Sequence, residues 1–295
     1  MRIVFLGTPQ FAVPTLEALA REHEIALVVA QPDKPAGRGL KMQPPAVALR
    51  AKELDLPLAQ PAKIRDALDT IAAARPEAGV VIAYGKILPA ALLAIPPRGF
   101  VNVHASLLPK YRGAAPIQRA IEHGERETGV TIMRVDEELD HGPMLSVART
   151  EIAPDEHTPS LALRLAALGA EEIVRCLRDW PRAIEQDHAA ATHAPKIEKH
   201  EGEIRWTETA ATIYDKFRAF DPWPGIFTGD LKFIDIRPVS GSGAPGTILR
   251  IDNGVVVAAR DDAIELRVVQ RAGKARVTAA EFAHGAGWHV GARIA

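Results

Sequence analysis

Cysteine is almost absent from this chain. Among 295 residues there is one, Cys176. A single thiol cannot form an internal disulfide, and a cysteine-rich zinc site is excluded as well. Cys176 lies in a segment with leucines at helical spacing, so we expect it to be a small buried hydrophobic residue. The scarcity of cysteine fits a reducing compartment.

Long hydrophobic runs are also missing. No stretch approaches the roughly 18 apolar residues that a membrane helix needs. The first apolar run, Ile3 to Leu6, is broken by Gly7-Thr8-Pro9-Gln10 and followed by Glu17, which does not suit a signal peptide. We therefore expect no membrane association and a cytoplasmic location.

An excess of charge of either sign is lacking too. The 36 Lys and Arg residues stand against 37 Asp and Glu residues, for a net charge of -1. This balance excludes a globally basic nucleic-acid binder, although a local basic patch remains compatible with it. The charged fraction of 25% and the hydrophobic fraction of 47% are typical of a folded globular protein.

Short β-branched and aromatic runs alternate with helical spacing over the first 180 residues. This alternation predicts an α/β domain with a Rossmann-like, mainly parallel sheet. The continuous apolar strands are typical of burial on both faces. Strands are expected at 2–6, 24–30, 78–84, 100–104, 130–135 and 144–152, and helices at 13–21, 46–54, 63–74, 117–122 and 159–179.

The composition and periodicity of the sequence change near residue 183. Residues 183–204 are polar and show no period, which predicts a linker after an α/β domain over 1–182. Residues 205–295 predict a small all-β domain of about five strands, a barrel size common in nucleic-acid readers. Its expected elements are a helix at 213–220 and strands at 231–237, 246–251, 254–259, 263–269 and 275–278, with turns at Asn253-Gly254 and Ala272-Gly273.

Two polar residues interrupt the apolar strand at 100–104. Asn102 and His104 are two positions apart, so both project from one face of that strand. At the carboxyl end of a parallel strand they would face the crevice in which α/β sheets bind ligands. Asn can donate to a developing oxyanion, and His can carry a proton or a charge near neutral pH. From spacing alone, a hydrogen-bonded core histidine and a capping asparagine are the commoner explanation.

Two loops add further candidates. Asp140 follows the strand at 130–135 and could orient an imidazole, although from spacing alone an ordinary solvated acidic loop is the preferred explanation. Lys34, Arg38 and Lys41 lie in a loop rich in proline and glycine, where basic side chains suit phosphate contacts. A solvated loop without a ligand fits that pattern too.

The sequence lacks several catalytic motifs. The turn at Gly7-Thr8-Pro9 is not a dinucleotide fingerprint, and there is no P-loop. Ser106 does not lie in a nucleophile elbow, and there is no His-Glu-x-x-His zinc motif.

One long segment carries a specific resemblance. The run from Asn102 to Gln118 closely resembles the signature of the formyltetrahydrofolate-dependent formyltransferases, and Leu139 to Pro143 resembles the aspartate loop of that family. Three further stretches are similar to the branch that acts on initiator methionyl-tRNA, so the resemblance covers nearly the whole chain. These stretches are Gly7 to Ala12, Gln31 to Gly39 and Phe220 to Gly225.

The resemblance implies transfer of a formyl group. The donor would be 10-formyltetrahydrofolate, and the acceptor would be the amine of methionine carried on initiator tRNA. Asn102 would donate to the oxyanion, with His104 as charged partner or proton carrier. Asp140 would hold His104 in the required charge state and help remove the proton from the attacking amine, either directly or through water.

The resemblance also implies the binding residues. Ser106, Leu107, Leu108 and Pro109 would lie against the folate, and Lys34, Arg38 and Lys41 would approach the tRNA acceptor end. By the same resemblance, residues 1–182 would be the catalytic domain, and the C-terminal domain resembles an OB-like barrel that would hold the tRNA by backbone charge and shape. No metal is implied, and a monomer is expected.

Three other functions remain open at this point. The same fold could formylate a nucleotide-sugar amine or glycinamide ribonucleotide, but a small acceptor needs neither the basic loop nor the C-terminal domain. The same triad could hydrolyse the donor with water as acceptor. A catalytically silent RNA-binding protein is the third, against which the intact Asn102, His104 and Asp140 argue.

Overall fold

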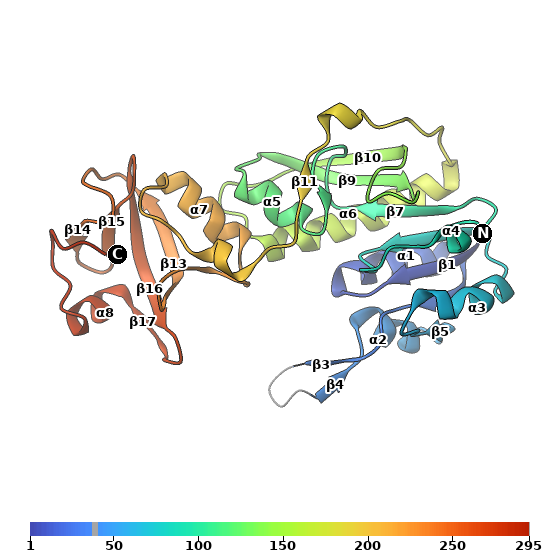
Figure 1. Ribbon diagram of the computed structural model, residues 1–295, viewed down its shortest axis with the longest axis horizontal. Helices are drawn as coiled ribbons and strands as arrows, with labels where there is room; N and C mark the ends of the chain where they lie inside the picture. The colour runs from blue at the N-terminus through green and yellow to red at the C-terminus, as the bar shows by residue number, and fades with distance from the viewer. Residues whose placement is uncertain (37–40, 295) are drawn as a thin grey trace. The chain divides into compact units, whose positions relative to one another are not determined.

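The computed structural model describes residues 1–36 and 41–294, and the chain divides into two compact units (Figure 1). The first unit contains Met1–Pro116, Glu127–Glu151 and Leu161–Ala194. The second contains Ile117–Arg126, Ile152–Ser160 and Pro195–Ala295. Two segments that precede residue 182 in the chain therefore group with the second unit, and the predicted division at 182 and 204 stays a prediction.

A seven-stranded sheet forms the centre of the first unit, in the order β10-β9-β7-β6-β1-β2-β5 (Figure 1). The pairs from β7 to β5 are parallel, whereas β9 runs antiparallel to both β7 and β10. The mainly parallel sheet confirms the predicted fold class. The strands are β1 (Arg2–Gly7), β2 (Glu24–Val29), β5 (Leu58–Ala59), β6 (Ala78–Ile82), β7 (Phe100–His104), β9 (Glu127–Arg134) and β10 (Met144–Glu151).

The helices form where leucine, isoleucine and alanine recur at helical spacing. In α1, for example, Leu16 and Leu19 are completely buried three residues apart. The helices and 3-10 turns of this part are η1 (Gln10–Ala12), α1 (Val13–Glu22), α2 (Ala46–Glu53), η2 (Ile64–Ala67), α3 (Leu68–Ala73), α4 (Ala90–Leu93), α6 (Thr158–Asp179) and η3 (His188–Ala190).

Helix α6 covers one face of the sheet at β7. A Cβ added at Gly169 of α6 would lie 2.8 Å from Cγ1 of Val103, so glycine permits this close approach. Val103 is 3% exposed. Because side chains alternate along a strand, Asn102 and His104 point to the face of β7 opposite the helix. The packing of α6 thus leaves the polar face of β7 available for a site.

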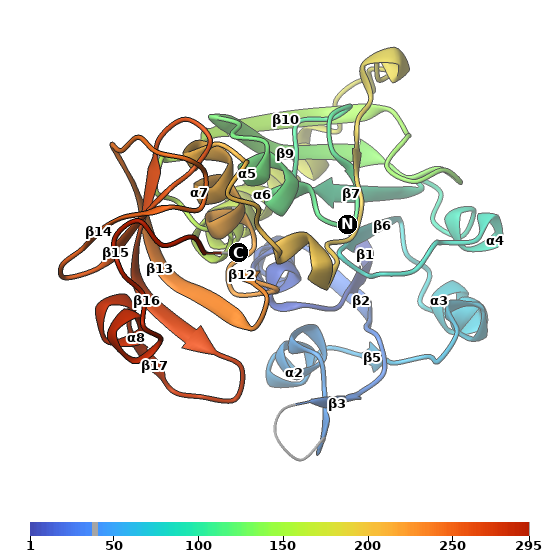
Figure 2. The ribbon, with the colours of Figure 1, turned by 60° about the vertical axis from the view of Figure 1, so that its left-hand side comes forward.

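Two small sheets accompany the main one. Strands β8 (Arg112–Gly113) and β11 (His193–Ala194) pair in parallel, so part of the predicted linker is joined to the segment after β7. Strands β3 (Lys34–Ala36) and β4 (Lys41–Gln43) pair antiparallel and form the hairpin seen in blue in Figure 2. The segment predicted as an irregular loop therefore contains a short β-hairpin.

The second unit is built on an antiparallel sheet in the order β12-β13-β16-β15-β14, with β17 paired to β16. The five strands predicted in this region are all present. A sixth, β12, and helix α8, which lies beside β16 and β17 in Figure 2, were not predicted. The strands are β12 (Ile226–Thr228), β13 (Leu231–Val239), β14 (Ile248–Ile251), β15 (Val255–Ala258), β16 (Ala263–Arg271) and β17 (Arg276–Thr278).

Threonine side chains cap the N-termini of helices α7 and α8 in the C-terminal region. The Thr209 hydroxyl accepts from the backbone N–H of Thr212 at the start of α7, and Thr278 with Glu281 forms a capping box at the start of α8. The predicted all-β character is therefore incomplete, and closure of the sheet into an OB-like barrel stays a prediction. The helices and turn of this unit are α5 (Pro116–Glu122), η4 (Lys199–Gly202), α7 (Ala210–Ala219) and α8 (Ala279–Gly285).

Candidate functional site

Asn102, His104 and Asp140 meet on the polar face of β7. The Asn102 Nδ2 donates to Asp140 Oδ1 at 3.3 Å, and the same oxygen lies 3.6 Å from Nδ1 of His104. The side chains of His104 and Asp140 are 6% and 10% exposed. The three residues singled out from the sequence are therefore neighbours in a site with little access to water.

The histidine ring is oriented from its far side. Its Nε2 lies 2.9 Å from the carbonyl oxygen of Tyr111, and a carbonyl can only accept a hydrogen bond. Nε2 therefore carries the proton in the neutral ring, which leaves Nδ1, the atom facing Asp140, free to take one up. This assignment follows from the hydrogen-bond partners. The arrangement suits His104 for proton transfer at Nδ1.

Asp140 reaches the site by folding back over the sheet. Because β9 is antiparallel to β7, Arg134 at its end pairs with Val101 at the start of β7. The connection from residue 135 to 143 must then return along the sheet. The backbone N–H of Arg134 donates to the Pro143 carbonyl at 2.9 Å, which joins the two ends of this connection. Asp140 itself adopts a left-handed backbone with φ of 50°. A second carboxylate oxygen, Oδ2, accepts from the N–H of Gly113 at 2.9 Å.

Gln186 binds the backbone of this connection, and Arg112 binds Gln186. The Gln186 amide donates to the carbonyl oxygens of Asp140 and Gly142, and the Arg112 guanidinium donates to the amide oxygen of Gln186. Sequence reasoning missed both residues. Arg112 lies within the resembling motif without an assigned role, and Gln186 lies in the aperiodic segment 183–204, where no pattern marks it.

The predicted folate-contacting segment is a tight turn after β7. The Ser106 hydroxyl donates to the Lys110 carbonyl at 2.7 Å, and Ser106 is completely buried. The backbone N–H of Leu108 donates to the Thr131 hydroxyl at 3.1 Å, which fixes the turn to β9. Leu107 and Pro109 are only partly buried. These two are the members of the predicted set whose side chains retain surface for a ligand.

The predicted tRNA-contacting residues lie on the β3–β4 hairpin. Lys34 in β3 and Lys41 in β4 are exposed. Arg38 lies outside the described residues. The structure therefore brings the two lysines onto one small hairpin, and it does not place the arginine.

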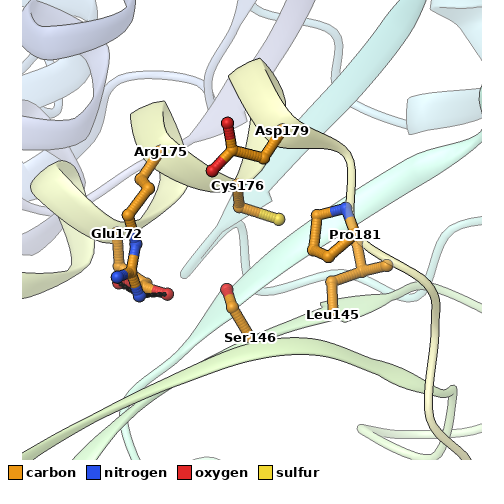
Figure 3. Close-up of a pocket in the computed structure, with 7 residues that line it drawn as sticks. All are labelled: Leu145, Ser146, Glu172, Arg175, Cys176, Asp179 and Pro181. Atoms are coloured by element: carbon orange, nitrogen blue, oxygen red, sulfur yellow. Dashed lines mark hydrogen bonds and ion pairs between the residues drawn. The ribbon is translucent and has the colours of Figure 1, made fainter.

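A separate pocket of about 190 Å³ lies between β10 and α6, with the lining residues drawn in Figure 3. Burial raises the pKa of the Cys176 thiol there, as expected for a buried cysteine. Sites for drug-sized ligands are typically 300–1,000 Å³, so this pocket is too small for a folate. Its lining contains none of the predicted site residues, so this pocket is separate from the candidate site on the polar face of β7.

Neither a membrane-spanning helix nor a metal-binding cluster is present among the residues that the structure describes. Within 1–36 and 41–294, no helix combines the length and hydrophobicity that crossing a bilayer requires. In the same ranges, no cluster of three or more His, Cys, Asp or Glu side chains is arranged to hold a metal ion. The expectation that no metal takes part stays a prediction.

Comparisons with known proteins agree along the chain. The family described as "Formyl transferase" matches residues 1–177, and "Formyl transferase, C-terminal domain" matches residues 196–287. The methionyl-tRNA formyltransferase of Thermus thermophilus is 45% identical over 302 residues, which cover 100% of this chain and 99% of that protein. The methionyl-tRNA formyltransferase of Roseobacter denitrificans is 47% identical over 294 residues, covering 97% and 96%.

A more distant likeness comes from solved structures. The N-formyltransferase from Helicobacter canadensis, in complex with folinic acid and dTDP-3-aminofucose, has a TM-score of 0.69 at 16% identity. The match covers 90% of this chain and 98% of that one. At this identity the likeness shows a shared fold and no shared acceptor.

Proposed function

We propose that this chain, which belongs to the formyl transferase family, transfers the formyl group of 10-formyltetrahydrofolate to the amino group of methionyl initiator tRNA for translation initiation. The observation that carries this proposal is similarity of about 45% identity to methionyl-tRNA formyltransferases over the full chain. The convergence of Asn102, His104 and Asp140 on one face of β7 supports it independently.

The reaction moves one carbon between two nitrogens. The methionine amine attacks the formyl carbon, a tetrahedral oxyanion forms, and the bond from that carbon to the folate nitrogen then breaks. The amine loses one proton and the departing folate nitrogen gains one. The protein must therefore stabilise an oxyanion and move a proton.

Asn102 suits the oxyanion. Its amide has two N–H groups, of which one is directed to Asp140 Oδ1. The second N–H can donate to the developing oxyanion, as preorganised donors do in acyl transfer. The contact with Asp140 holds the amide in one orientation, so the donor needs no rearrangement during the reaction.

His104 and Asp140 suit the proton transfer. Nδ1 of His104 faces the carboxylate, and the contact of Nε2 with the Tyr111 carbonyl fixes the ring. We propose that Nδ1 takes the proton from the amine and returns it to the leaving nitrogen, while the Asp140 carboxylate stabilises the charged ring.

The binding roles are proposals of the same kind. Leu107 and Pro109 would form an apolar wall for the flat ring of the folate, with Ser106 and Leu108 holding the turn in shape. Lys34, Arg38 and Lys41 would contact tRNA phosphates. We propose that the protein acts as a monomer in the cytoplasm, where initiator tRNA is used.

The direct test is formyl transfer from 10-formyltetrahydrofolate to methionyl initiator tRNA. Elongator methionyl-tRNA and a reaction without tRNA serve as controls. We expect formyl-methionyl-tRNA from the initiator alone. Consumption of the donor without this product would overturn the acceptor, and product analysis would then distinguish a small amine from water.

A further inference from the structure

We infer that Gln186, held by Arg112, is a positioning residue that keeps Asp140 in its working place. This inference rests on the proposed function, because it concerns the aspartate of that catalytic site. Gln186 is 46 residues away from Asp140 in the chain and 74 away from Arg112. It is 4% exposed, although Glu185 and Asp187 on either side are exposed.

Every hydrogen-bonding group of the Gln186 side chain is used. Its Nε2 donates to the Asp140 carbonyl at 3.0 Å and to the Gly142 carbonyl at 2.7 Å. Its Oε1 accepts from Nε and Nη2 of Arg112 at 3.1 and 2.7 Å. The chemistry permits only this orientation of the amide, since carbonyls cannot donate and a guanidinium cannot accept. The side chain therefore clamps both sides of residue 141 to a buried arginine.

The clamp acts on a residue with an uncommon backbone. With φ of 50°, Asp140 lies in the left-handed region, which is uncommon outside glycine although aspartate adopts it more readily than most residues, and its surroundings help to hold it there. The Gly113 N–H holds its carboxylate at Oδ2, and Gln186 holds its carbonyl. Losing the second contact frees the backbone to relax, which moves Oδ1 away from Asn102 and His104.

Arg112, which supports Gln186, is itself held in place. It is 7% exposed, and its backbone N–H donates to the Thr192 carbonyl at 2.8 Å. Its Nη2 also contacts Nδ1 of His188 at 2.9 Å. The His188 ring stacks on His141 at a centroid distance of 4.1 Å. His188, two residues after Gln186, and His141, the residue after Asp140, therefore make a second contact, which ties the segment 183–190 to the aspartate loop.

The decisive test is a double-mutant cycle in the formyl transfer reaction. We expect Gln186→Leu to lower kcat at least tenfold with little change in either KM, because substrate contacts remain while Asp140 moves. In an Asp140→Ala background the same change should cost less than twofold, because the group it positions is gone. Equal losses in the two backgrounds would overturn the inference.

Two variants separate positioning from general damage. Gln186→Glu keeps an oxygen for Arg112 but removes both N–H donors to the loop, so we expect it to be as impaired as Gln186→Leu. Wild-type activity in Gln186→Glu would contradict the proposed contacts. Glu185→Ala, at the exposed neighbouring position, is the matched control and should retain wild-type kcat.

A measurement independent of activity distinguishes this inference from the proposed function. The Gly113 amide donates to Asp140 Oδ2, so its hydrogen exchange reports whether the carboxylate is in place. We expect faster exchange at Gly113 in Gln186→Leu, with unchanged exchange at Val28, whose N–H donates to the Pro57 carbonyl. Absence of formyl transfer in the wild type would refute the function alone, whereas unchanged exchange at Gly113 would refute the positioning role.

Discussion

At the scale of single residues, the side chains of Asp140 and His104 each contact more than one neighbour. Asp140 uses Oδ1 toward Asn102 and His104 and Oδ2 toward Gly113. The Nε2 of His104 contacts the Tyr111 carbonyl, and its Nδ1 faces Asp140. In a site so little exposed, electrostatic contacts are stronger than in water, and a missing partner is costly. Single substitutions should therefore act on rate more than on binding.

Asn102→Ala tests the oxyanion role. The change removes the N–H donor but creates no new charge, and we expect kcat to fall roughly 10²–10³-fold, as for other oxyanion donors. Steady-state kinetics measure this directly, and thermal unfolding checks that the fold is intact. Unchanged kcat in a folded variant would exclude Asn102 as the donor.

At the scale of elements, the order and direction of the strands decide where the candidate site lies. Strand β7 presents the polar pair because α6 covers its other face. Antiparallel β9 then returns the aspartate loop over that pair. The β3–β4 hairpin is different, since it carries exposed lysines and contributes little to the core. We assign it to binding of the polyanionic substrate.

Removal of charge from the hairpin tests this assignment. We expect Lys34→Ala, Arg38→Ala and Lys41→Ala together to raise KM for tRNA while leaving donor KM unchanged. Each lost phosphate contact should lower the slope of log KM against log salt concentration by about 1. Lys52→Ala, which removes an exposed lysine of α2, is the matched control. Equal effects on tRNA and donor would contradict the assignment.

At the scale of the whole molecule, three chain segments build the second compact unit. Arg119 of α5 joins two of them: its guanidinium donates to Glu201 at 2.7 and 3.0 Å and to the Pro195 carbonyl. The hydrogen bonds from Arg119 hold the pKa of Glu201 below the usual glutamate range. A carboxyl whose pKa is lowered on folding stabilises the protein at neutral pH, and that contribution is lost as the pH falls through its folded value.

Glu201→Gln tests this contribution. At pH 7 we expect the free energy of unfolding to fall by about 1.5–3 kcal/mol, the range for hydrogen bonds to charged groups. The difference from the wild type should shrink as the pH falls through and below the usual glutamate range, because the unfolded carboxyl takes up a proton before the folded one, whose pKa is lowered. Denaturant unfolding across the acid range up to neutral pH measures it, with Glu203→Gln as the exposed control. A pH-independent difference would show that the ion pair is not its source.

Much of the fold and the centre of the site can be predicted from local patterns. The apolar run at 100–104 predicts strand β7, and the period of two places Asn102 and His104 on one face. Helix α8 was missed, although Thr278 and Glu281 form a capping box, because the segment is short and few of its residues are buried. The pairing of β3 with β4 was missed because no alternation of apolar and polar residues marks these two short strands.

The sequence by itself determined most of the elements, the family and the three side chains of the candidate site, since periodicity and motifs depend on neighbouring residues. Only the tertiary structure decided that β9 runs antiparallel, that Asp140 returns over β7, and that Gln186 holds it in place. Those contacts join residues 38, 46 and 74 positions apart. No local period specifies such pairs, because they form only when the sheet order and the packing of the loops bring distant segments together.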